Sequence, residues 1–331
     1  MNHYTRISLS LLLLSSCHPG DSTPQAPQSS PSSSSAEGNE EDAVWTEDSR
    51  WLLPGSEPSF SFTPLSEDED ECSFFVKRGY GQVNVPSFSP DGRRVTRMSR
   101  PHGGINVSQI TELVFPEGFR GYDYSAFYGY QNLLRIRFPE SVEFSGPLIG
   151  CPNLTEVYLP ESYTNVCDEF LRRCGNVRTV HLSSKTESIG SSAFEDCAKL
   201  LRIDLPDTLQ SVGSLAFRGC ASLTSVELPK SLTEVYTATF ARCTSLVDVQ
   251  LSEGIQKLGT QAFFGCTRLS QVFLPSSVQE ISSECFMDCS KDLTLYCETK
   301  ERPEGWAEDF CGDSPVKIVW GAKRSDVPSY H

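Results

Sequence analysis

The sequence predicts an α/β repeat solenoid, in which units of about 23 residues stack with a parallel β-sheet on the concave face and short helical or irregular turns on the convex face. Three features lead to this prediction. Seven cysteines follow one another at intervals of 23 residues, namely Cys151, Cys174, Cys197, Cys220, Cys243, Cys266 and Cys289. An apolar residue precedes each by three positions, namely Leu148, Leu171, Phe194, Phe217, Phe240, Phe263 and Phe286. A strand pattern follows the cysteines in the same register.

Each unit contains the strand pattern L-x-x-V/I-x-L-P, as in residues 223–229, and the pattern begins upstream at Ile110. The Val or Ile and the last Leu point to the same side, because alternate residues of a strand share a face. The proline ends the strand where no backbone donor is needed. Dipeptides such as Ala216-Phe217 are expected to open a short helical turn on the opposite wall. One unit cannot bury its apolar side alone, so the units must stack around a shared core.

The unit resembles the BspA-like leucine-rich repeats of bacterial surface proteins, whose pattern is L-x-x-I-x-L-P … I-G-x-x-A-F-x-x-C-x-x-L. One stretch matches it position by position, with Ile189, Gly190, Ala193, Phe194, Cys197 and Leu200. The resemblance implies an N-terminal cap over 72–109, leucine-rich repeats over 110–297 and a C-terminal cap over 298–331. The chain departs from the pattern at a few positions, namely Tyr130 in place of Cys, Cys167 in place of Gly, and Ser183 and Ser252 in place of Pro.

The first 16 residues have the composition of a signal peptide. A short apolar run from Ile7 to Leu14 is too short to span a bilayer as a helix but suits a secretory leader. It ends in Leu14-Ser15-Ser16-Cys17, which resembles the lipobox of bacterial lipoproteins. The resemblance implies lipidation of Cys17 and an exported, membrane-anchored protein displayed at the cell surface. The alternative is an ordinary secretory peptide followed by a chance cysteine.

Residues 17–71 are predicted to form the lipid anchor and a disordered tether rich in Ser, Pro and acidic residues. Such a composition buries too little apolar surface to offset the entropy of ordering. Between Glu37 and Glu71 there are twelve acidic residues and only Arg50 as a base, so this stretch holds -11 of the net charge of -15. The remainder is close to neutral. Nothing indicates the basic surface of a nucleic-acid binder.

The cysteines allow three interpretations. Exported chains with many cysteines can form a disulfide framework, but equivalent side chains of stacked units point the same way, which suits a bridge poorly. We therefore expect the repeat cysteines to be buried thiols that pack as small apolar groups. Cys297 and Cys311 lie outside the column and could form a disulfide in the cap. A zinc site using these two with Cys285 and Cys289 is disfavoured, so no metal and no cofactor is predicted.

No catalytic pattern is present. Among the five histidines only His181 lies within a repeat, and the sequence contains no H-E-x-x-H, G-x-S-x-G, Walker or dinucleotide-binding motif. The chain is therefore predicted not to be an enzyme.

The predicted binding site is the outward side of the concave sheet. Residues between the inward positions of each strand project outward and form columns across the repeats. The predicted partner-binding residues in these columns are Arg135, Arg137, Tyr158, His181, Arg202, Asp204, Glu227, Asp248, Gln250 and Phe273. Tyr158 and Phe273 resemble interface anchors, since aromatic residues and Arg are enriched where proteins dock. The alternative is that all of these are ordinary solvated strand residues.

The predicted function is therefore recognition by a surface-displayed binding protein. The family resemblance implies adhesion to a protein or glycan on host or neighbouring cells, with the membrane contacted through the N-terminal lipid. Two alternatives stay open. The chain could be an envelope scaffold without an external ligand, or, with less support, a hydrolase acting on a captured polymer.

Overall fold

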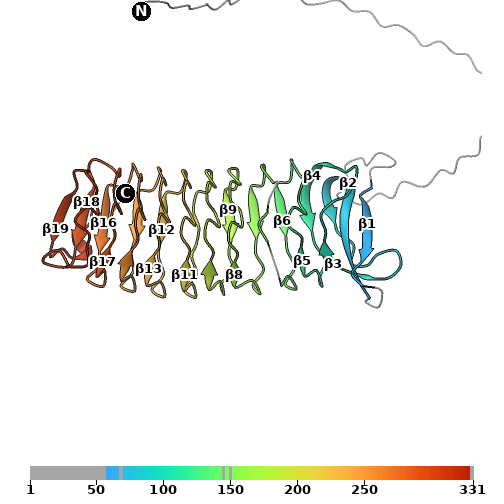
Figure 1. The fold of residues 1–331 in the computed structure, drawn as a ribbon, viewed down its shortest axis with the longest axis horizontal. Coiled ribbons are helices and arrows are strands. Elements are labelled where there is room, and N and C mark those ends of the chain that lie inside the picture. The colour runs from blue at the N-terminus through green and yellow to red at the C-terminus, as the bar shows by residue number, and fades with distance from the viewer. Residues whose placement is uncertain (1–56, 67–69, 144–145, 149–150, 329–331) are drawn as a thin grey trace, which may run out of the picture. The chain divides into compact units, whose positions relative to one another are not determined.

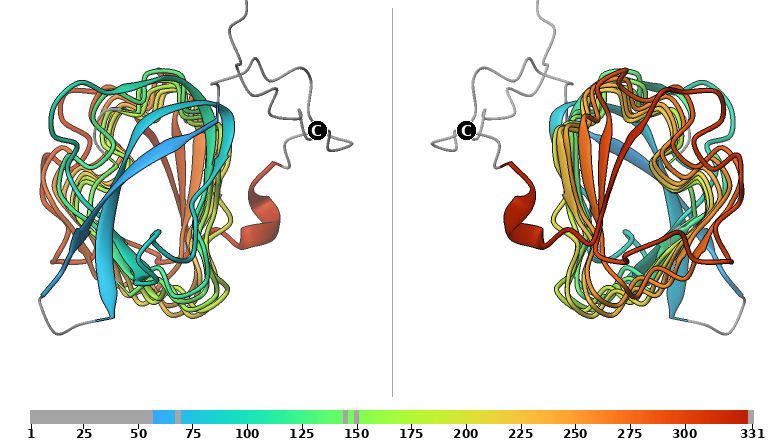
Figure 2. Two further views of the ribbon diagram at one scale, coloured as in Figure 1. Left: turned by 90° about the vertical axis from the view of Figure 1, so that its right-hand side faces the viewer. Right: turned by 90° about the vertical axis from the view of Figure 1, so that its left-hand side faces the viewer.

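The computed structural model describes residues 57–66, 70–143, 146–148 and 151–328. The predicted signal peptide and Cys17 lie outside these residues. The repeat region is a solenoid of stacked coils, as predicted (Figure 1). Viewed along the stack, successive coils superpose with three walls around one core (Figure 2). Among the described residues no helix is long and apolar enough to cross a membrane.

The first wall carries the strands that the repeat pattern predicts. They are β4 (Asn106–Val114), β6 (Arg135–Arg137), β7 (Glu156–Tyr158), β9 (Thr179–His181), β12 (Ser225–Glu227), β14 (Asp248–Gln250), β16 (Gln271–Leu274), β18 (Thr294–Cys297) and β19 (Lys317–Trp320). Where successive strands pair, they are parallel and equivalent residues of neighbouring coils stand side by side, as Arg137 does with Tyr158 and Tyr158 with His181. We call the outward side of this wall the β-face.

The second wall consists of shorter parallel strands. They are β3 (Arg94–Met98), β5 (Gly121–Tyr122), β8 (Asn165–Val166), β10 (Ser188–Ile189), β11 (Ser211–Val212), β13 (Glu234–Val235), β15 (Lys257–Leu258) and β17 (Glu280–Ile281). Their second residue is buried, which matches the second apolar pair of each repeat. These strands turn the chain from the β-face towards the third wall.

The third wall, which we call the turn wall, is made of turns instead of the short helical turns expected at the Ala-Phe dipeptides. Two left-handed residues flank the dipeptide in each regular coil, for example Leu215 (φ 62°) and Gly219 (φ 74°) around Phe217. Positive φ interrupts an α-helix. The backbone N–H groups of all three residues instead donate to carbonyls of the next coil, at 2.8–3.0 Å. The described residues contain one helix, the 3-10 helix η1 (Arg324–Asp326).

Two side-chain ladders fill the core behind the turn wall. The rings of Phe194, Phe217, Phe240, Phe263 and Phe286 stack with centroids 5.2–5.6 Å apart and planes within 18° of parallel. Each repeat cysteine follows three positions later. The Cys243 thiol donates to the carbonyl of Phe217, 26 residues earlier, at 3.2 Å, and Cys220 and Cys266 repeat this contact. A small thiol fits beside a ring and supplies a weak donor to a buried carbonyl.

The ordered solenoid begins before residue 71, where the predicted tether was expected to end. Strand β1 (Ser59–Pro64) pairs antiparallel with β2 (Glu71–Asn84), and the two form the first described layer. Phe60 and Phe62 alternate with polar residues and pack on the core, with the Phe60 ring 6.1 Å from that of Phe74. The predicted tether therefore extends too far, because the acidic composition around it masked a short alternating strand.

The C-terminal end keeps its cysteines unbridged. Cys297 is buried on β18 and Cys311 is half-buried in the last coil, and both are free thiols, as are all twelve cysteines among the described residues. The cap disulfide considered from the sequence is therefore not formed in this structure. Trp306 closes the second wall through a single parallel bridge to Ile281 and donates its indole N–H to the Val278 carbonyl at 3.1 Å.

Candidate partner-binding face

The β-face presents the predicted columns outward. In the three-residue strands the central residue is buried and its neighbours are more exposed, as in Arg135-Ile136-Arg137 and Ser225-Val226-Glu227. Parallel pairing keeps these outward side chains in line from one coil to the next. Of the predicted residues, all but Phe273 are exposed or half-buried, so they occupy the positions that the period predicts.

Two arginines at the N-terminal part of the β-face are held by one buried carboxylate. Glu112 on β4 is 5% exposed. Its Oε2 accepts hydrogen bonds from Nε and Nη2 of Arg135 at 3.2 and 3.0 Å, and its Oε1 accepts one from Nε of Arg137 at 2.9 Å. Both arginine side chains remain about half exposed. Glu112 thus orients the arginines while their outer edges stay accessible.

The repeat pattern alone does not single out Glu112 as part of this site. It stands 23 residues before Arg135, in the same column, and register pairs the two residues directly. An acid one repeat before an arginine is a usable signal, because neighbouring coils place those side chains side by side.

The aromatic part of this surface is a stack. The rings of Tyr158 and His181 lie 4.2 Å apart with planes 6° from parallel, and Cζ of Arg137 lies 5.6 Å from the Tyr158 centroid on the same column. Tyr158 Oη donates to Glu156 at 2.8 Å, and His181 Nε2 lies 3.1 Å from the same carboxylate oxygen. The hydrogen bond from Tyr158 is the main cause that lowers the pKa of Glu156, and the hydrogen bond from His181 is the second. The hydrogen bond between Tyr158 and Glu156 also raises the pKa of Tyr158. We call Arg135, Arg137, Tyr158 and His181, with Glu112 and Glu156, the Arg-Tyr-His cluster.

The middle of the β-face is more solvated. Arg202 and Asp204 pair with each other at 2.6 Å, and both side chains are largely exposed. Gln250 donates to Asp248 within its own strand at 3.2 Å. These contacts are local and exposed, so they orient the side chains less firmly than the buried Glu112 does.

The prediction that Phe273 is an accessible partner-binding residue is wrong in this structure. It occupies an outward position on β16 but is only 6% exposed. The guanidinium of Arg324 covers its ring, with Cζ 4.7 Å from the centroid. Residues 323–328, which we call the C-terminal strap, lie beside the β-face, and η1 within it stands outside the coils (Figure 2). The sequence could not show this, because the strap belongs to no repeat.

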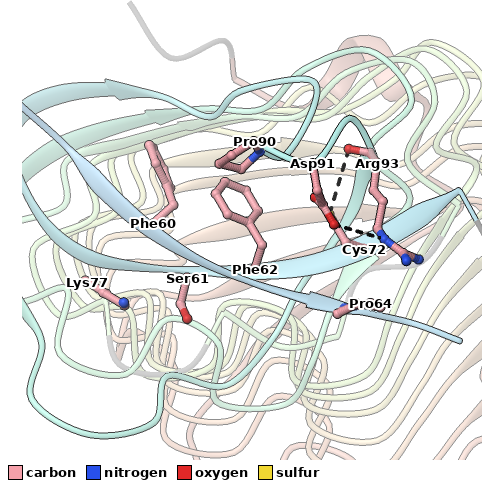
Figure 3. Close-up of a pocket in the computed structure, with 9 residues that line it drawn as sticks. All are labelled: Phe60, Ser61, Phe62, Pro64, Cys72, Lys77, Pro90, Asp91 and Arg93. Carbon is pink, nitrogen blue, oxygen red and sulfur yellow. Dashed lines mark hydrogen bonds and ion pairs between the residues drawn. The ribbon is translucent and has the colours of Figure 1, made fainter. Parts of the chain in front are cut away.

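A cavity of about 330 Å³ lies at the N-terminal end, between β1, β2 and the loop before β3 (Figure 3). Phe60 and Phe62 line it together with an ion pair between Asp91 and Arg93 at 3.1 Å. Cys72 borders it, but its side chain is fully buried and burial raises its pKa, which disfavours the nucleophilic thiolate. The described residues contain no group of three or more His, Cys, Asp or Glu arranged to hold a metal ion.

Comparison with known proteins identifies the repeat. The sequence profile of the BspA type leucine rich repeat region matches six copies in residues 105–200 and 164–294. No curated protein matches the chain.

Similar solved structures include a Treponema pallidum leucine-rich repeat protein, with 24% identity over 63% of this chain and 87% of that one and a TM-score of 0.41. A leucine-rich cell surface protein of Faecalibacterium prausnitzii shares 16% identity over 85% of this chain and 97% of that one, with a TM-score of 0.38. The pneumococcal vaccine antigen PcpA shares 14% identity over 80% of this chain and 86% of that one, with a TM-score of 0.39.

Proposed function

Because the chain belongs to the family of proteins with BspA-type leucine-rich repeats, we propose that it is a surface-displayed binding protein that recognises a protein or glycan through the β-face. In this proposal lipidation of Cys17 attaches the exported chain to a bacterial membrane, and the acidic tether holds the solenoid away from it. The observation that carries the proposal is the Arg-Tyr-His cluster, a set of outward groups already held in one geometry.

Preorganisation is what distinguishes this cluster from ordinary surface residues. Ordering a long side chain on binding costs about 0.5–1.5 kcal/mol, and arginines already bound to Glu112 have lost part of that freedom. Tyr158 and His181 cover one another's ring faces, so a partner meets their edges together with the Arg137 guanidinium. Arg and Tyr are also the residue types that dominate binding energy at protein interfaces.

Partner binding through the β-face can be tested by comparing a β-face variant with a control variant on the other two walls. Full-length chain would be used to recover partners from host-cell and bacterial extracts, alongside a double variant Tyr158→Ala, Arg137→Glu. The matched control is Tyr236→Ala, Arg242→Glu, which changes an exposed tyrosine after β13 and an exposed arginine of the turn wall. We expect recovery to fall about tenfold or more for the first variant, as for loss of a binding hot spot, and to be unchanged for the control. Equal recovery by both variants would exclude the cluster as the binding site.

The lipid anchor has its own test. Cells expressing the chain would be fed an alkyne-tagged fatty acid, and we expect label on the wild-type protein and none on Cys17→Ser. Label that persists in Cys17→Ser, or no label on the wild type, would remove the lipoprotein assignment while leaving the β-face proposal in place.

A further inference from the structure

The C-terminal strap reaches far back along the stack. The chain is anchored up to Ala322, whose N–H donates to the Cys297 carbonyl at 2.9 Å, and whose side chain is buried. From there the strap crosses towards β14, and Arg324 contacts Leu251, 73 residues earlier. Gln271 donates to the carbonyl of Pro328 at 2.6 Å and holds the other end of the strap.

Arg324 occupies a site with the three features that suit a guanidinium. It lies over the Phe273 ring at 4.7 Å, donates to the Leu251 carbonyl at 2.7 Å and approaches the Glu253 carboxylate to 3.7 Å. An aromatic face, a carbonyl acceptor and a carboxylate match the flat charged surface and fixed donors of arginine. We call Phe273, Glu253 and the Leu251 carbonyl the arginine pocket.

The pocket is not required to close the core. Val272 and Leu274 are buried on the inward side of β16, whereas Phe273 points outward and has the Arg324 guanidinium over its ring. The strap buries little of its own surface, since Lys323 to Asp326 are all exposed and only Val327 is half-buried. A segment held by a few surface contacts opens at low free-energy cost. The strap is therefore displaceable without disturbing the solenoid.

The surface beside the arginine pocket is also rich in carboxylates. A hollow of about 440 Å³ adjoins Arg324 and is lined mainly by the ends of β12 and β14 and the residues that follow them, together with Asp207. Its acidic members are Asp207, Glu227 and Glu253, against Lys230 and Arg324 as bases. A basic segment seated in the arginine pocket could thus extend along the β-face over carboxylates.

We propose that the arginine pocket receives an arginine side chain from an extended, basic segment of a protein partner, and that Arg324 occupies the pocket until such a segment displaces it. This proposal rests on the β-face being the binding surface, and it adds a second contact point with the opposite charge preference to the Arg-Tyr-His cluster. The strap then competes with the partner for the arginine pocket and lowers the apparent affinity of the chain for that partner.

The test uses the strap itself as the probe. A labelled peptide with the sequence of residues 322–328 would be titrated by fluorescence anisotropy into the full-length chain and into a variant that ends at Ala322. An intramolecular competitor acts at an effective concentration of about 1 mM, so the truncated variant is expected to bind at least about tenfold tighter than the full-length chain. A matched peptide with Arg324→Ala should lose this binding, as should truncated chains carrying Phe273→Ala or Glu253→Gln.

Equal binding of both peptides by the truncated variant, or no binding up to millimolar peptide, would overturn the proposal. In the full-length chain, Phe273→Ala should also speed tryptic cleavage after Arg324, because the strap loses its main contact, and an unchanged cleavage rate would count against the pocket. These measurements involve neither Tyr158 nor Arg137. A failure here is therefore separable from a failure of the proposed β-face function.

Discussion

The turn wall and the β-face belong to the same coils but use their columns differently. On the core side of the turn wall one residue type repeats, with phenylalanine at five successive equivalent positions and a thiol three residues after each. On the β-face the outward column changes at every coil, from Arg137 through Tyr158 and His181 to Asp204 and Glu227. Identical neighbours suit stacking of flat rings, whereas varied neighbours create a surface with distinct chemistry along its length. The repeated columns hold the stack together, whereas the varied columns are the ones to which we assign recognition.

The largest expected contrast is between two aromatic residues. Phe217→Ala should lower the free energy of unfolding by about 3–5 kcal/mol, because it empties a fully buried position between two stacked rings. Tyr158→Ala on the β-face should change it by no more than about 0.5 kcal/mol. Urea denaturation of the full-length chain, followed by far-UV circular dichroism, measures both. Similar losses in the two variants would contradict the division between the walls.

A second contrast compares two glutamates. Glu195 on the turn wall is 4% exposed and bridges Arg172 at 2.9 Å and Arg218 at 2.6 Å, each from an adjacent coil. Glu195→Gln removes the buried charge that links the two coils, leaves Arg172 paired only with Glu169 and Arg218 without this partner, and should cost about 1–3 kcal/mol. Glu227→Gln, at an exposed β-face position, should stay within about 0.5 kcal/mol. The same denaturation experiment tests the pair, and a neutral Glu195→Gln would show that the bridge contributes nothing to stacking.

The thiol ladder predicts a smaller effect. Cys243→Ala removes one buried sulfur and should cost about 1 kcal/mol, close to the value for one buried methylene group. Burial also raises the pKa of the Cys243 thiol to about 12. Iodoacetamide at pH 8 should therefore alkylate Cys243 in urea but not in the native chain, as peptide mass mapping would show. Native-state labelling would mean that the coils open locally around this position.

The smallest effect concerns the protonation of Glu156. Its pKa is lowered by the bond from Tyr158 and then by that from His181. A lowered carboxyl pKa contributes stability above the unfolded value, and that contribution is lost as the pH falls through the folded value. Carboxyl NMR titration should place Glu156 below an ordinary glutamate. Tyr158→Phe should move it back upward by more than His181→Ala does, and the reverse order would refute the assignment of the main cause.

Several features of the molecule had a weak signal in the sequence or none. The burial of Phe273 depends on a strap that starts 50 residues later and obeys no period. Strand β1 was hidden because Phe60 and Phe62 lie in a stretch whose overall composition is that of a tether. The turns of the third wall were expected to be helical, because the Ala-Phe dipeptide favours a helix and the left-handed residues around it, such as Leu215, have no distinctive identity.

The sequence by itself determined the repeat period, which residues face the core, and which outward residues align from one coil to the next. A shift of one repeat, which is 23 residues or 21 in the short unit between Leu133 and Leu154, returns the chain to the same place in the next coil, so spacing in the sequence becomes adjacency in space. It therefore placed Arg137, Tyr158 and His181 side by side on one face. Only the tertiary structure decided which outward residues are accessible and how they are held, as with Glu112 beneath the arginines and Arg324 over Phe273. Those contacts depend on side-chain reach and on the course of a segment outside the repeat, and periodicity specifies neither.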